Sequence, residues 1–397
     1  MSKLPTILIL SIAIISIIII SSLGYVIWSA IDNHNSINYE DTNNNVSKDS
    51  NIDIQENTNS DVNEHTNSDM QENTDSDVNE NTNSDALDSN DNHNDEIDLL
   101  SQLNNALEKP TILNLTYHHI DLEPDNNPVT VTPAQFEAHI SALQKSEYQP
   151  VTYEQITRFI TISDEARKLM LLSRLLTPAE EQWISDSITF VKTLPEQGFH
   201  ITFDDGYKSV YQYAVPILLE AKLPMTFFVI TKSSNKEWET APYYINYPHV
   251  TWEELQIIQR YPQFQVQSHT YSLHSYEPGD GSSIPSLSGR IFRADLGRVE
   301  SHEEFLERIY QDMILSKSYL QNRLSPHKVT GMSYPYGVYT DDVIEMAAKA
   351  DIQYLFTNQP DLVTYRTSAT AIPRLNAGDP DISARKLLAL MEQYFSN

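Results

Sequence analysis

The segment HITFDDGY, residues 200–207, places two adjacent aspartates, Asp204 and Asp205, between an apolar strand and Gly206. Consecutive side chains of a strand point to opposite faces, but a sharp turn into a glycine lets both carboxylates reach one cavity. A solvated Asp–Gly turn is the alternative interpretation, and the tripeptide alone favours it. The apolar context on both sides, ITF before and YKSVYQYAVPILL after, favours instead a buried strand that ends at a site.

A histidine pair, His269 and His274, follows a second apolar strand in the segment QSHTYSLH. Residues five apart do not share one face of a helix, so we expect this pair on a turn or loop. Each histidine alone fits an ordinary core or surface position. With one of the two aspartates, however, they offer an Asp/His/His ligand set that keeps coordination positions open for water and substrate. The other aspartate is then available as a base, and the sequence predicts a metal-assisted hydrolase.

Short apolar strands alternate with helical stretches from residue 110 onward, and this alternation predicts a mainly parallel sheet. The expected strands are 111–117, 200–203, 225–230, 264–268, 331–334 and 354–357, with a shorter extended stretch at 151–153. The expected helices are 136–143, 210–220, 252–260, 305–323, 341–350 and a C-terminal helix from residue 382. We therefore expect residues 109–397 to form one α/β domain, a distorted (β/α) barrel.

Polar residues follow the carboxyl ends of several expected strands. The five of them are His118, Asp204, Asp205, His269 and Tyr336. In a parallel β/α barrel these ends converge on one face, and that face carries the chemistry. A helix-rich insertion at 165–197 is expected to form a lid or a side wall, and residues 276–298 a long loop over the same rim.

The N-terminal residues 1–31 are almost wholly apolar. The run from Leu4 to Ala30 carries no charge between Lys3 and Asp32 and is long enough for a helix to cross a bilayer. A cleavable signal peptide usually has a shorter apolar region and a small-x-small site after it. We therefore expect an uncleaved transmembrane anchor, with secretion after signal cleavage as the alternative. A lysine before the span and an aspartate after it place the rest of the chain outside a bacterial cell membrane.

Residues 32–108 form a polar, acidic segment. Residues 31–98 contain 19 acidic residues and one lysine, so they supply about −18 of the net charge of −29. An eight-residue repeat runs from Glu56 to Leu87 without glycine or a hydrophobic face, and such a repeat cannot build a solenoid core. We expect a disordered, self-repelling linker. Calcium binding by the Asp/Asn repeat is the alternative.

The composition excludes several classes of protein. The chain has no cysteine, so disulfides add nothing to its stability and a metal must use nitrogen and oxygen ligands. The acidic balance leaves no basic stripe that would neutralise phosphates, which argues against a nucleic-acid partner. The sequence does not indicate an oligomeric state.

Two further motifs offer catalytic groups. His118 and His119 follow the strand TILNLTY, and a histidine with a pKa near neutrality can protonate a leaving group. A strand-end histidine bonded to the backbone is the alternative. The tight turn YPYG, Tyr334–Gly337, presents aromatic rings that suit a sugar groove and a backbone N–H that suits an oxyanion.

In this order, the segments TFDDG, SHTYSLH and PYG resemble the motifs of the polysaccharide deacetylase family (NodB-homology, carbohydrate esterase family four). The resemblance covers roughly Pro110 to Leu375. It implies a distorted (β/α) barrel, a zinc-type divalent ion and hydrolysis of N-acetyl groups from N-acetylhexosamine polymers. It also implies that Asp204 is the catalytic base and that Tyr336 belongs to the turn whose backbone N–H meets the oxyanion. The implied metal ligands are Asp205, His269 and His274.

Two departures from the family pattern refine the resemblance. The histidines are one residue further apart than in the usual H-[ST]-x-x-H, and no Leu-x-His motif follows Gly337; LTYHHI opens the domain instead. Both features resemble the circularly permuted subgroup that includes the biofilm poly-β-1,6-N-acetylglucosamine deacetylases. In that subgroup the first strand supplies the acid histidine, which implies His118 over His119. The arginine that usually precedes the PYG turn is absent, and Arg374 is the candidate that restrains Asp204 in its place.

The expected function is therefore zinc-dependent N-deacetylation of an extracellular N-acetylglucosamine polysaccharide, poly-β-1,6-N-acetylglucosamine being the first choice. Peptidoglycan, chitooligosaccharides and an O-acetylated polysaccharide are the alternative substrates. A catalytically silent polysaccharide-binding module is the alternative from another class of protein. The expected partners are the polysaccharide and, through the N-terminal helix, the membrane.

Overall fold

The computed structural model describes residues 89–123, 127–172, 174–235 and 247–396. The predicted transmembrane anchor and most of the predicted acidic linker lie outside the described residues. Within them, no helix has both the length and the apolar character that a membrane crossing requires.

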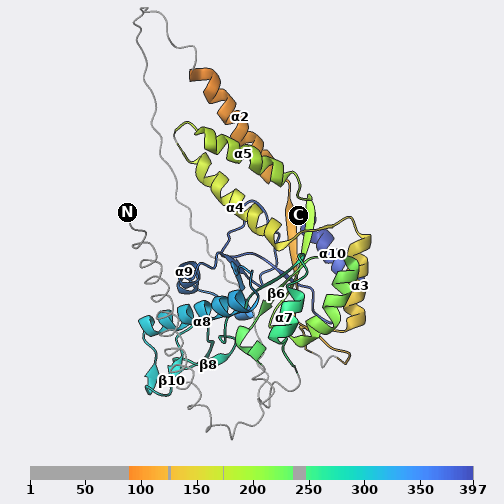
Figure 1. Cartoon of the computed structure of the whole chain (residues 1–397), viewed down its shortest axis with the longest axis vertical. Coiled ribbons are helices and arrows are strands. Elements are labelled where there is room, and N and C mark those ends of the chain that lie inside the picture. Colours follow the sequence, from red (N-terminus) through yellow and green to blue (C-terminus); the bar gives the residue numbers. More distant parts are fainter. Residues whose placement is uncertain (1–88, 124–126, 173, 236–246, 397) are drawn as a thin grey trace, which may run out of the picture. The chain divides into compact units, whose positions relative to one another are not determined.

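A parallel sheet forms the centre of the fold (Figure 1). Its strands are β1 (Thr111–Tyr117), β4 (Gln149–Pro150), β5 (Gln197–Phe203), β6 (Met225–Val229), β7 (Phe264–Ser268), β12 (Gly331–Ser333), β13 (Tyr354–Phe356) and β14 (Leu375–Asn376). Their order is β13-β12-β7-β6-β5-β1-β14, with β4 paired beside the start of β5. The last strand of the chain therefore pairs with the first, β14 beside β1. The described strands form a curled, open parallel sheet covered by helices, which is the coarse form of the predicted (β/α) barrel.

The described α-helices are α2 (Ser89–Leu107), α3 (Pro133–Lys145), α4 (Tyr153–Met170), α5 (Pro178–Val191), α6 (Val215–Ala221), α7 (Trp252–Ile258), α8 (His302–Arg323), α9 (Asp341–Lys349) and α10 (Ala384–Phe395). Seven of the described helices, all except α2 and α6, begin after a Thr or Ser whose side chain caps the helix, and each of the seven buries apolar residues. Four of them, α4, α5, α7 and α8, begin with a capping box, in which a Thr or Ser and the Gln or Glu three residues later satisfy N–H groups at the helix start. These local signals explain why most helices lie where the sequence pattern places them. The expected extended stretch 151–153 is wrong in part: the strand there is β4, and helix α4 already begins at Tyr153, because Thr152 caps it.

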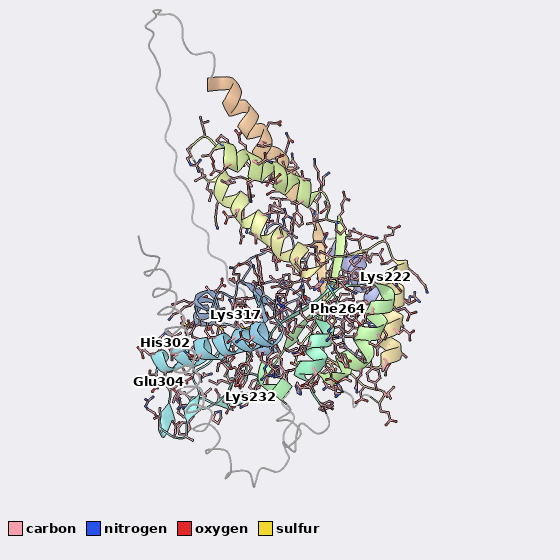
Figure 2. The ribbon with its side chains drawn as sticks, viewed as in Figure 1. Lys222, Lys232, Phe264, His302, Glu304 and Lys317 are labelled. Carbon is pink, nitrogen blue, oxygen red and sulfur yellow. The ribbon has the colours of Figure 1, made fainter. Side chains whose placement is uncertain are left out.

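Three small two-stranded pairs lie outside the main sheet. They are β2 (His119–Ile120) with β3 (Thr130–Val131), β8 (Tyr276–Pro278) with β9 (Ser283–Pro285), and β10 (Phe292–Arg293) with β11 (Arg298–Val299). The stretch predicted as one long loop over the rim, 276–298, thus contains most of the last two pairs. The interior is apolar, and Phe264 lies fully buried at the start of β7, whereas His302 and Glu304 lie at the periphery (Figure 2).

Two expectations about the amino side of the sheet are wrong. Helix α2 occupies residues assigned to the disordered linker, and its Leu103 and Leu107 are buried against α4 and α5. The insertion 165–197 forms neither a lid over the predicted site nor a side wall beside it: α5 leads into the amino end of β5, and the Glu196 carbonyl accepts a hydrogen bond from the Thr111 N–H at the amino end of β1 (3.0 Å). Figure 1 shows α2, α4 and α5 side by side. The insertion therefore packs at the end of the sheet opposite to the predicted site, because its apolar residues find a partner in α2.

Candidate metal centre

The register of β1 and β5 brings two predicted catalytic residues to the same level. Tyr117 pairs with Phe203, so the next residues, His118 and Asp204, leave neighbouring strands together. The Asp204 N–H donates to the Tyr117 carbonyl (3.1 Å), which extends the pairing by one step. Both strands are almost entirely buried. The sheet therefore holds these two side chains on its carboxyl edge with little freedom.

The Asp–Asp–Gly turn directs both carboxylates into the interior. Asp205 has a φ of 71° and Gly206 a φ of 84°. A Cβ on Gly206 would lie 3.2 Å from the Val229 Cβ, so a side chain there would meet both strain and crowding. Asp204 and Asp205 are 1% and 6% exposed. The alternative of a solvated Asp–Gly turn is therefore wrong.

Asp205 meets both histidines of the pair. Its Oδ1 lies 3.2 Å from the Nε2 of His269 and 3.2 Å from the Nε2 of His274. The three side chains offer one ligand atom each, and these atoms lie within 4.8 Å of one another. Bonds of about 2.0–2.1 Å to a tetrahedral ion would separate neighbouring ligands by about 3.3 Å. The spacing of Asp205 from the two nitrogens suits such an ion.

The hydrogen bonds around the three ligands leave room for a cation. The His269 Nδ1 contacts the Ser333 carbonyl (2.9 Å), and donating to it leaves the lone pair on Nε2, facing Asp205. The Asp205 Oδ1 is buried and accepts no hydrogen bond of normal geometry from a described residue. A buried acceptor that faces the lone pair of another acceptor is unfavourable unless a proton or a cation lies between them. The donor set therefore fits a divalent metal.

Burial and charge act in opposite directions on these ligands. Burial by itself raises the pKa of Asp205, but the charge of His274 and the contact with His269 outweigh it and hold that pKa well below its ordinary value. Burial lowers the pKa of His274, but the Asp205 carboxylate outweighs it and this pKa lies above its ordinary value. Asp205 is therefore ionised at neutral pH, as a metal ligand must be.

Arg374 reaches Asp204 from a distant part of the chain. Its guanidinium donates to both carboxylate oxygens, at 2.7 Å each, and is itself fully buried. Further donors go to the Thr357 carbonyl (2.9 Å) and the Asn358 Oδ1 (2.7 Å). Burial raises the pKa of Asp204, but Arg374 together with His269 outweighs it, and the pKa lies below its ordinary value. The structure thus brings together the pair that the sequence analysis named.

The two adjacent histidines after β1 point to different places. The His119 Nδ1 lies 2.9 Å from the Ser209 Oγ, and its ring packs against those of Tyr207 and Tyr247. His118 faces the carboxylates: burial lowers its pKa, and the charges of Asp205 and Asp204 act in the opposite direction. Its buried Nδ1 has no hydrogen-bond partner among the described residues. Of the two, His118 is therefore the histidine beside the aspartates.

Tyr336 lies next to the metal ligands. Its ring is 4.5 Å from that of His274 and 4.6 Å from that of Tyr276, measured between centroids. Its backbone has a φ of 59°. Five described non-glycine residues have a positive φ, and three of them, Asp205, Thr270 and Tyr336, lie in or beside this site. Such conformations cost about 1–3 kcal/mol each and cluster at functional sites.

Two further residues of this region were not predicted from the sequence. His249 is buried, and its burial, countered by the Asp205 charge, lowers its pKa to about 4. It comes long after β6 rather than at a strand end, so the strand-end pattern does not select it. Asn358, which accepts from Arg374, does follow β13 closely, but an asparagine alone carries no chemical signal. A cavity of about 170 Å³ beside the site is lined by Thr116, His118, Val129, Asn358, Arg374 and Asn376.

This fold and site define a class: an α/β domain with a candidate three-ligand metal centre at the carboxyl edge of a parallel sheet. Residues 192–355 match the family described as polysaccharide deacetylase, and the chain therefore carries a polysaccharide deacetylase domain. The resemblance drawn from the motifs is confirmed.

Curated relatives agree with this family, and a solved structure shares the fold. The chain is similar to poly-beta-1,6-N-acetyl-D-glucosamine N-deacetylases from Staphylococcus aureus strain N315 (25% identical over 185 residues, 47% of this chain and 56% of that protein) and Escherichia coli K12 (27% over 214 residues, 51% and 31%). The match thus spans about half the length of the Staphylococcus aureus protein and about a third of the Escherichia coli protein. The fold is similar to that of a de-N-acetylase from Aggregatibacter actinomycetemcomitans, with a TM-score of 0.57, 21% identity and coverage of 72% of this chain and 99% of that one.

Replacing His274 tests the metal centre directly. We expect His274→Ala to lower zinc affinity by more than the ~10–100-fold that loss of an outer hydrogen-bond partner causes, because it removes a ligand atom. His302→Ala, at an exposed histidine of α8, is the matched control and should leave the affinity unchanged. Calorimetric titration of the metal-free protein measures both. Equal affinities in the two variants would contradict the ligand assignment.

Proposed function

We propose that this protein is a zinc-dependent N-deacetylase of poly-β-1,6-N-acetylglucosamine, tethered outside the cell membrane by its N-terminal segment. The observation that carries the proposal is the meeting of Asp205, His269 and His274 around one point, with Asp204 and His118 beside them. The family match supports the reaction class. The similarity to poly-beta-1,6-N-acetyl-D-glucosamine N-deacetylases supports the substrate.

The residues divide the chemistry of amide hydrolysis among themselves. A divalent cation held by Asp205, His269 and His274 supplies Lewis-acid polarisation of a carbonyl oxygen and lowers the pKa of water. Asp204 accepts a proton from the attacking water. Its two oxygens each keep a lone pair for this role, because the Arg374 fork occupies only one on each. Ionised and oriented in this way, Asp204 acts as general base.

Two further groups complete the reaction. The Tyr336 backbone N–H donates a hydrogen bond to the oxyanion that develops on the acetyl oxygen. His118 protonates the departing amine, which leaves on the sugar while the acetyl group leaves as acetate. His118 is half-buried; burial lowers its pKa, and the charges of Asp205 and Asp204 act in the opposite direction, towards the protonated form that a general acid needs. The base, Asp204, and the acid, His118, directly follow the neighbouring strands β5 and β1. The register of these strands brings both residues to the same edge of the sheet, beside the metal ligands.

One assay tests the reaction and the substrate together. Full-length protein is given poly-β-1,6-N-acetylglucosamine, chitooligosaccharides and peptidoglycan in parallel, with and without a chelator, and released acetate is measured. We expect release from the first polymer, loss of release with the chelator, and recovery when zinc is added back, because the ligands hold the cation on which hydrolysis depends.

The other outcomes separate the alternatives. Faster release from chitooligosaccharides or peptidoglycan would replace the substrate and keep the enzyme. Binding of a polymer without any release of acetate would make the domain a polysaccharide-binding module. Full activity after removal of all divalent ions would overturn the metal-dependent mechanism.

A further inference from the structure

The loop between the two histidine ligands has an unusual support. Thr270, directly after His269, has a φ of 73°, and its side chain accepts from the Leu273 N–H (3.1 Å). Between these positions, the backbone N–H groups of Tyr271 and Ser272 point at one carboxylate, that of Asp312. The distances are 2.7 Å to its Oδ1 and 2.8 Å to its Oδ2. Each carboxylate oxygen thus takes one N–H of the loop.

Asp312 comes from α8, which packs along this side of the sheet. It is 6% exposed. One turn further along α8, the Ser316 Oγ lies 2.7 Å from the Ser268 Oγ at the end of β7 and 2.7 Å from the Thr231 Oγ1. Residues four apart share one face of a helix. The same face of α8 therefore holds both the strand end and the ligand loop, and Figure 2 marks this helix by Lys317.

The second side of the loop is held by backbone bonds. The segment η2 (Thr231–Asn235) donates from the Thr231 N–H to the Thr270 carbonyl (3.1 Å) and from the Lys232 N–H to the Tyr271 carbonyl (3.0 Å). Carbonyls thus face η2 and N–H groups face Asp312. The described contacts of the loop with η2 join backbone to backbone, whereas its contacts with Asp312 depend on a side chain and can be tested by substitution.

A buried carboxylate is costly unless its oxygens are hydrogen-bonded. Burial raises the pKa of Asp312 to about 6, and the N–H groups of Tyr271 and Ser272 and the charge of Arg308 act in the opposite direction. Its hydrogen bonds to described residues all go to Tyr271 and Ser272. If this position of α8 served stability alone, a buried apolar side chain would stabilise the fold more than a buried carboxylate does. The carboxylate touches no ligand atom itself.

We propose that Asp312 is a positioning residue of the metal centre. By taking the two N–H groups inside the loop, it holds His269 and His274 at the separation at which both Nε2 atoms face Asp205. The loop has one residue more than the family pattern, and the extra length brings an additional backbone N–H that needs a partner. This inference rests on the proposed metal-dependent function, because it assumes that a divalent cation occupies the site.

The test compares two substitutions in α8 of the full-length protein. Asp312→Asn keeps the shape, but its amide group faces a backbone N–H where an oxygen was, so one clamp bond is lost and replaced by a donor–donor contact. Leu320→Ala, at a fully buried residue of α8 that packs in a different part of the core from the loop residue Leu273, destabilises the helix packing away from the loop. Cobalt(II) and zinc affinities, the visible spectrum of bound cobalt and the melting temperature of the metal-free protein are measured for each.

We expect Asp312→Asn to weaken cobalt and zinc binding by about 10–100-fold and to change the cobalt spectrum. Leu320→Ala should lower the melting temperature, keep the metal affinities within threefold of the parent's, and leave the cobalt spectrum unchanged. An Asp312→Asn protein with the parent's affinity and spectrum overturns the inference, as does an equal loss of affinity in both variants. A parent protein that binds neither ion overturns the metal centre itself, so the two failures are distinguishable without any assay of activity.

Discussion

Asp204→Asn lowers the rate of deacetylation by about 10²–10⁴-fold while the protein keeps its metal. A positioned general base contributes a factor of this size, and asparagine cannot accept the proton of water. The metal should stay, because Asp204 is not among the three ligands and the substitution is nearly isosteric. Single-turnover rates and metal analysis of the same preparation measure the two effects.

This variant needs a control for folding. Asparagine is uncharged and keeps only one of the two oxygens that accept hydrogen bonds from the buried Arg374 guanidinium. The melting temperature must lie well above the assay temperature for the rate to be interpreted. Asp295→Asn, at an exposed aspartate that pairs with Arg293, is the matched control and should change neither quantity. A rate within tenfold of the parent would exclude Asp204 as the base.

Arg374→Met lowers the free energy of unfolding by about 3–5 kcal/mol, because it leaves the Asp204 carboxylate buried without its partner. Both side chains of this pair are essentially inaccessible to solvent. Arg293→Met breaks the half-exposed pair with Asp295, and we expect about 0–1 kcal/mol there. Urea unfolding of the metal-free proteins measures the difference.

The double variant Arg374→Met/Asp204→Asn removes both charges and should recover part of the loss. It should remain inactive, since the base is gone. A loss below 1 kcal/mol in Arg374→Met alone would show that water or another cation reaches Asp204, and the restraint on this carboxylate would then have to come from elsewhere.

Local sequence patterns predicted a large part of the fold. The strand 111–117 is found as β1, and the expected strand at 200–203 is the second half of β5. These segments are recognisable because runs of apolar residues between turn residues suffice to define a buried strand. The failures came from segments whose partners are distant. Helix α2 has a polar composition and is held by contacts with α4 and α5, which no local pattern reveals.

The candidate site divides in the same way. Side chains that can bind a metal rarely occur at or shortly after the end of an apolar strand. This is why four residues stood out: Asp204, Asp205, His269 and His274. His249 and Asp312 did not, because one lies in a loop and the other within a helix, where acids are common. Arg374 was named only through the resemblance, as a substitute for a missing arginine.

The amino-acid sequence by itself determined the chemical groups of this protein and the strands that end at them, since strand formation and turn geometry depend on neighbouring residues. Only the tertiary structure decided which groups meet. The guanidinium of Arg374 reaches a carboxylate 170 positions earlier in the chain, and Asp312 reaches across 40 or 41 positions to the ligand loop. Such meetings depend on strand register and helix packing, and these are settled by the burial of the whole core rather than by any single segment.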